Sequence, residues 1–150
     1  MKDIHVLSFE GQNIRDVSHL VNAVNYVQQY ERAIVVITAF DQTHNKLLAI
    51  TDTAISGNLD AAHALCDEIY DLYYDFIQQA LKSHPNPKNT LILETTDKKL
   101  EDYTFRLKKL LGYADKIRDH QDRWVDSILP IGDQMAAYVF SQTALSWGIL

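Results

Sequence analysis

The chain has little cysteine, glycine or proline, and it contains no long apolar run. Its one cysteine, Cys66, cannot form an internal disulfide, and it makes no metal site alone. The apolar runs are far too short to span a membrane, and the N-terminus lacks the apolar segment and cleavage site of a signal peptide. We therefore expect a cytoplasmic protein without a disulfide framework, a metal site or a membrane segment.

Positive charge is also scarce in this chain of 150 residues. Lys and Arg number 14 against 20 Asp and Glu, which gives a formal net charge of −6. Nucleic acids and anionic membranes attract proteins with a positive field, so this balance argues against both as partners. Hydrophobic residues make up 47% of the chain, enough for one core. We expect one domain over residues 1–150.

The first forty residues predict a βαβ unit. Two short apolar segments, 4–9 and 33–39, are typical of strands, and between them apolar residues recur with the helical period of 3.6. The second segment is apolar without alternation, which is typical of a parallel strand buried on both faces. A right-handed crossover through a helix at 14–27 makes the two strands parallel neighbours.

The rest of the chain predicts helices. The expected ranges are 43–55, 60–82 and 97–111, with an extension at 115–121, and a last helix that starts at 132–133 and ends at 146. The expected stops are Gly57, the segment 84–87, Gly112 and Gly148. The segment 90–94 fits either a strand or a helix start. Two strands make a poor sheet, so either the chain is the first part of a larger α/β fold or a partner chain completes its sheet.

Polar residues gather where the two predicted strands end. In an open α/β sheet, ligands bind beyond the carboxyl ends of the strands. Here these ends are 8–13 and 38–45, and both lead into helices whose free N–H groups suit an anion. The predicted helix start at Gly132 has the same character. These three segments are the candidates for a ligand site.

The three segments also carry motifs. They read SFEGQNI at 8–14, VVITAFDQTHNKLL at 35–48 and ILPIGDQMA at 128–136. In this order they resemble the N-terminal half of the aspartate kinases, which belong to the amino-acid kinase family. The corresponding family motifs are Lys-Phe-Gly-Gly-Thr-Ser-Val, Val-Val-Ser-Ala followed by Thr-Asn with leucines, and Ser-Phe-Gly-Glu followed by Leu-Ser.

The resemblance implies a fold and a reaction. The fold is the N-terminal part of a three-layer αβα amino-acid-kinase-like α/β fold, helix-rich with a small parallel sheet. The reaction is the phosphorylation of the side-chain carboxylate of aspartate by Mg-ATP. The family's catalytic positions fall at Ser8, Glu10 and Gly11. Its substrate-binding positions fall at Thr38, Thr43, His44 and Asp133.

The departures from the family pattern concern the residues that contact phosphate. The family lysine stabilises the charge of the transferring phosphoryl group, but Ser8 at this position carries no charge. The first glycine is replaced by Glu10, whose charge has the wrong sign for polyphosphate. The family's nucleotide-binding second half has no counterpart here. We therefore expect a truncated and catalytically inactive form, which binds ATP and Mg only if it is active.

Two other functions stay open. The first is a phosphotransferase completed by another polypeptide, in which Lys46 replaces the missing lysine. The second is a non-catalytic module that binds aspartate or another small amino acid near Thr38, His44 and Asp133, or that binds another subunit.

A homo-oligomer or a complex with a partner subunit is expected because an unpaired sheet edge invites pairing. The structural alternative for Asp133 is an acidic residue that stabilises a helix N-terminus, and for His44 a solvated residue.

Overall fold

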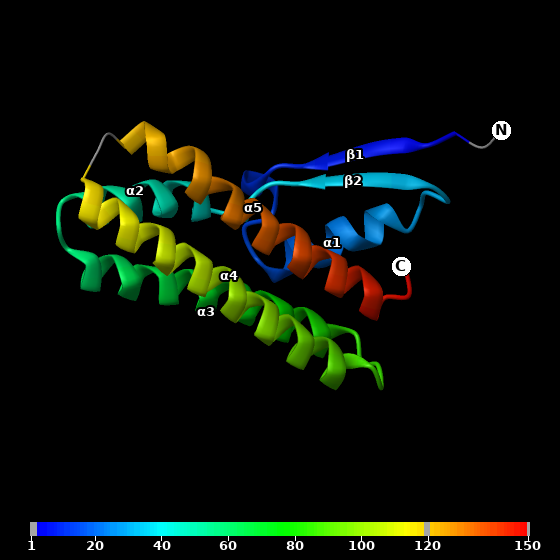
Figure 1. The fold of residues 1–150 in the computed structure, drawn as a ribbon. Helices are drawn as coiled ribbons and strands as arrows, with labels where there is room; N and C mark the ends of the chain where they lie inside the picture. The colour runs from blue at the N-terminus through cyan, green and yellow to red at the C-terminus, as the bar shows by residue number, and fades with distance from the viewer. Residues whose placement is uncertain (1–2, 119–120, 150) are drawn as a thin grey trace.

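The computed structural model describes residues 3–118 and 121–149, and its architecture is helix-rich with one small parallel sheet (Figure 1). In chain order the elements are β1 (His5–Phe9), the short 3-10 helix η1 (Gly11–Asn13), α1 (Val17–Val27), β2 (Ala33–Ile37), α2 (Thr43–Ile55), α3 (Leu59–Ser83), α4 (Asn89–Ile117) and α5 (Gln121–Ser146). Within the described residues, no helix is both long and apolar enough to cross a membrane.

The predicted βαβ unit is present. β1 and β2 pair in parallel, with His5 opposite Ala33 and Phe9 opposite Ile37, and α1 connects them. Figure 1 shows α1 and α5 on the same side of the two strands. The side chains that point to these helices, such as Leu7 and Val35, pack against the hydrophobic core.

The outer face of the sheet is uncovered. Ile4, Val6, Ile34 and Val36 are exposed by 46–67% although all four are large and apolar. The prediction that the second strand is buried on both faces is therefore wrong within the described residues. Both faces of β2 are apolar, as the sequence indicated, but helices cover only one of these faces.

α4 is longer than predicted because Gly112 does not end it. The helix continues to Ile117, and its C-terminal cap is Arg118, which has the left-handed φ of 47°. The ambiguous segment 90–94 lies in its first turns. Part of the predicted extension at 115–121 falls on residues 119–120, outside the described residues.

The start of the last helix was also predicted wrongly. α5 begins at Gln121 and contains Pro130, so Gly132 and Asp133 lie in the helix interior. The expected helix N-terminus at these residues, with its free N–H groups, does not exist. Gly132 has a packing role instead, because a Cβ atom there would lie 2.7 Å from Leu47 Cδ1. A side chain at this position would fit only if Leu47 moved, so the glycine favours the close contact between α2 and α5.

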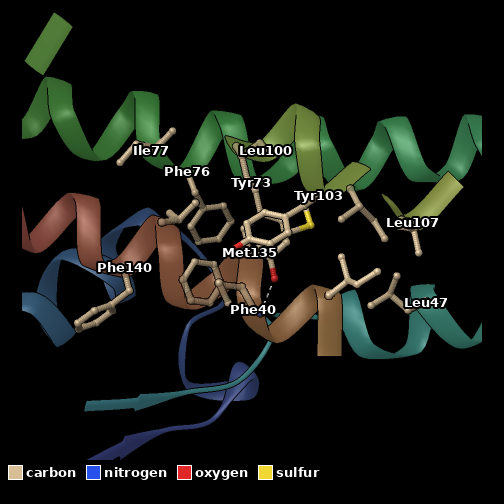
Figure 2. Packing of buried hydrophobic residues seen from close by; sticks show 14 of the residues in the cluster. Phe40, Leu47, Tyr73, Phe76, Ile77, Leu100, Tyr103, Leu107, Met135 and Phe140 are labelled. Atoms are coloured by element: carbon tan, nitrogen blue, oxygen red, sulfur yellow. Dashed lines mark hydrogen bonds between the residues drawn. The ribbon is translucent and has the colours of Figure 1, made fainter. Parts of the chain in front are cut away.

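An aromatic cluster joins the strand ends to the helices. Phe40 follows β2, and its ring centroid lies 5.3 Å from that of Tyr73 and 5.2 Å from that of Phe76. Figure 2 shows these rings between α3 and α5, with Met135 beside them. Tyr73 and Phe40 are completely buried. The loop after β2 is thus anchored in the centre of the core.

Gly112 provides a test of the α4 boundary. Nothing lies within 4 Å of a Cβ atom built at this position, and its backbone is helical. We expect Gly112→Ala to raise the free energy of unfolding by about 0.5–1 kcal/mol, because alanine loses less backbone entropy in a helix. Urea denaturation measures this change. Gly57→Ala is the matched control and should destabilise, because Gly57 has φ 88° and a Cβ there would lie 2.8 Å from Arg118 Nη2. A destabilised Gly112→Ala variant would contradict the continuous helix.

Cys66 is completely buried on α3, and this burial raises the pKa of its thiol to about 12. Because the thiolate is the reactive form, we expect native Cys66 to resist iodoacetamide at pH 8 and to react in denaturant. The raised pKa also gives a stability term that is present below the ordinary value of 9.0 and is lost as the pH rises toward 12. Mass spectrometry after timed alkylation measures the reactivity, and rapid native labelling would contradict the burial.

Candidate functional site

An open pocket of about 520 Å³ lies where the two strands end. It is formed by the segment after β1, the segment after β2, the first turn of α2 and the middle of α5. The lining residues are Glu10, Gly11, Gln12, Thr38, Ala39, Asp41, His44 and Asp133. This is the position at which the sequence predicted a ligand site.

The structure brings five of the seven candidate residues together. The five that line the pocket are Glu10, Gly11, Thr38, His44 and Asp133. Ser8 lies instead on the exposed outer side of β1. Thr43 is buried at the start of α2, and its Oγ1 has no hydrogen-bond partner among the described residues. Lys46 is exposed and does not line the pocket.

Gly11 lets the two strand ends approach each other. A Cβ atom at this position would lie 1.8 Å from the carbonyl oxygen of Ala39, so no other residue fits without movement of the backbone. The Gly11 N–H donates to Thr38 Oγ1 at 2.8 Å. The glycine therefore serves the contact between the two loops, and its N–H is occupied.

Asp133 ties α5 to the segment after β2. Its Oδ1 accepts a hydrogen bond from the Ala39 N–H at 2.8 Å, and the carboxylate is half-buried in the pocket wall. Because Asp133 lies in the helix interior, the alternative that it stabilises a helix N-terminus is wrong. The residue has a positioning role that sequence reasoning did not foresee.

Tyr73 of α3 holds the segment after β2 from the side of the core. The Phe40 N–H donates to the hydroxyl oxygen of Tyr73 at 2.9 Å (Figure 2). The hydroxyl lies 3.4 Å from the carbonyl oxygen of Gly132. Burial raises the pKa of Tyr73, so the hydroxyl stays protonated at neutral pH. The sequence indicated only a core tyrosine, because helical periodicity reports the buried face and not the partner of a hydroxyl group.

Asp41 was also missed as a site residue. It has the left-handed φ of 47°, and its N–H is shared between the carbonyl oxygens of Gly11 and Ile14 at 3.0 and 3.1 Å. Asp tolerates this conformation better than most residues. The turn places the Asp41 carboxylate at the pocket, and an Asp soon after a predicted strand was the available signal.

The pocket is negative. Its lining includes the carboxylates of Glu10, Asp41 and Asp133 but no Lys or Arg. Gln12 Nε2 donates to Glu10 Oε2 at 2.9 Å, which holds that carboxylate without neutralising it. The described residues contain no group of three or more His, Cys, Asp or Glu side chains arranged to hold a metal ion. The lining therefore favours a ligand group that carries positive charge.

Four backbone amides at the strand ends are already used inside the protein. The N–H groups of Gly11, Ala39, Phe40 and Asp41 donate to acceptors within the protein. A phosphate-binding loop needs such groups to point at the ligand. One donor region remains, because α2 begins beside the pocket with no side-chain cap and no acidic residue in its first turn.

Comparison of the chain with protein-family models and with curated proteins found no match.

Tyr73→Phe tests the anchoring of the loop. The substitution removes the acceptor of the buried Phe40 N–H, so we expect a loss of about 1–3 kcal/mol in the free energy of unfolding. Chemical denaturation measures the loss. Tyr113→Phe removes an exposed hydroxyl from α4 and should stay within about 0.5 kcal/mol of the parent chain. Equal effects of the two substitutions would show that the Tyr73 hydroxyl does not stabilise the loop.

Proposed function

We propose that the chain is an aspartate-kinase-like module that binds a small amino acid and does not transfer phosphoryl groups. The observation that carries the proposal is the composition of the pocket at the strand ends: three carboxylates, one histidine and no Lys or Arg. The motif order favours a relationship to the aspartate kinases, and the chemistry of the pocket favours binding without catalysis.

The carboxylates suit the ammonium group of the ligand. Glu10 and Asp41 both line the pocket with Asp133, and each can accept a hydrogen bond from an N–H of an ammonium group. One oxygen of Asp133 is used by the Ala39 N–H, which fixes the orientation of its carboxylate and leaves Oδ2 for a ligand. Oriented acceptors of negative charge favour a cationic group over a neutral one.

The start of α2 suits the carboxylate of the ligand. The Thr43 N–H donates to the Phe40 carbonyl oxygen at 3.0 Å, but the helix has no side-chain cap, and no backbone acceptor among the described residues takes the N–H groups of His44 and Asn45. These groups and the positive end of the helix dipole favour an anion. A zwitterionic amino acid can therefore span the pocket, with its carboxylate at α2 and its ammonium group at the acidic residues. A second carboxylate, as in aspartate, is less favourable in this field.

Phosphoryl transfer is not part of the proposal. Its transition state needs positive charge and free donors around the equatorial oxygens. Here Glu10 occupies a family phosphate position, Ser8 points away from the pocket, and the loop amides are used internally. The expected result of an ADP-release assay with Mg-ATP and aspartate is no turnover above the rate without protein.

Isothermal titration calorimetry tests the binding. Each amino acid is compared with an analogue that lacks the amine, such as alanine with lactate and aspartate with succinate. We expect at least one neutral amino acid to bind, and its deaminated analogue to bind at least ~10-fold more weakly, because the carboxylates of the pocket then have no ammonium group to accept from. Mg-ATP should give no heat of binding.

Glu10→Gln separates the site from the fold. Glu10 is exposed, and its carboxylate accepts from the Gln12 side-chain amide, which can also donate to a glutamine oxygen, so the substitution should weaken binding ~5–10-fold without changing the melting temperature. Glu94 is an exposed residue of α4 outside the pocket, so Glu94→Gln is the control and should leave binding unchanged. If no amino acid gives a heat of binding, the proposal of a binding module is wrong. A heat of binding from Mg-ATP would instead favour an active kinase.

A further inference from the structure

One edge of β2 is unpaired. The His5 N–H donates to the Arg32 carbonyl at 3.1 Å, and the Thr38 N–H donates to the Phe9 carbonyl at 3.2 Å. In a parallel strand, alternate residues bond to the same neighbouring strand. The even-numbered residues of β2 bond to β1, so its odd-numbered residues turn their N–H and C=O groups to the other edge. These residues are Ala33, Val35 and Ile37. No strand among the described residues pairs with them.

Both sides of this edge are apolar. On the outer side, Ile34 and Val36 are exposed by 54% and 46%. On the inner side, an open groove of about 240 Å³ lies between β2 and α5. Its lining is Val27, Ala33, Val35, Ile37, Ala137, Phe140, Ser141, Ala144 and Ile149. A strand that pairs with this edge must therefore carry apolar side chains on both of its faces.

We propose that this strand is β2 of a second copy of the chain, paired in antiparallel orientation. β2 is itself apolar on both faces, and the segment 33–40 contains neither a charged residue nor a proline that would block pairing. The two copies then share a continuous sheet in the order β1-β2-β2-β1. The same edge serves both copies, which is the arrangement of a twofold dimer.

The register follows from the positions of the edge groups. With Val35 opposite Val35 of the second copy, Ala33 lies opposite Ile37, so all the free N–H and C=O groups face one another. The same register places Ile34 opposite Val36 on the outer face. Each copy carries a net charge of −6, but no charged side chain lies between Ala33 and Phe40. The paired strands therefore bring no like charges together.

Outer-face substitutions test the dimer and its register. Sedimentation equilibrium of the full chain should give twice the chain mass. The double variant Ile34→Lys/Val36→Lys places like charges directly opposite each other, and we expect its dissociation constant to rise ~10-fold or more. The double variant Ile34→Glu/Val36→Lys places opposite charges at the same two positions and should remain dimeric. Both positions are exposed, so both variants should fold.

Val6→Lys distinguishes edge pairing from stacking of the outer faces. Val6 lies on β1, is 67% exposed and has no part in the proposed edge contact, so this variant should stay dimeric. In the parent chain, hydrogen exchange at Val35 should slow as the protein concentration rises. A monomeric parent chain would overturn the proposal. Loss of the dimer in all three variants would also overturn it, because face-to-face stacking would then explain the association.

Discussion

The segment after β2 is fixed by its own amide groups, and the candidate site depends on this. Ala39 donates to Asp133, Phe40 donates to Tyr73, and Asp41 donates to the carbonyl oxygens of Gly11 and Ile14. Three successive N–H groups thus connect β2 to α5, to α3 and to the loop after β1. The Phe40 ring adds apolar contact with α3. These bonds hold the strand ends, α3 and α5 in their relative positions around the pocket.

This arrangement also decides which ligands the pocket suits. Backbone N–H groups that donate within the protein are not free to bind polyphosphate, and one of their acceptors, Asp133, is an acidic side chain. The Asp133 carboxylate both positions the loop and contributes negative charge to the pocket. Asp133, which holds the loop in place, therefore also favours a cationic group over an anion. For the proposed function, this conflict argues against phosphoryl transfer more strongly than any single substitution does.

The sequence predicted the elements that depend on local pattern, and it failed where distant contacts decide. The βαβ unit, α2 and α3 follow from periodicity, and the strand ends indicated the position of the pocket. Gly112 was predicted to end a helix and Gly132 to begin one, but both lie in helix interiors, where α4 and α5 continue through them. Asp41 and Tyr73 were missed because their roles come from a left-handed turn and from a hydroxyl partner, which periodicity does not report. Local sequence patterns also could not predict that helices cover only one face of the sheet.

The bond between Asp133 and Ala39 joins residues that are 94 positions apart in the chain. A contact of this kind has an entropic cost, because the intervening chain must lose its freedom before the bond can stabilise it. The hairpin of α3 and α4, by contrast, uses neighbouring segments. The pocket wall that includes Asp133 therefore exists only when α5 is docked against the strand ends. Ligand affinity would then report on the docking of the last helix as well as on the chemistry of the pocket.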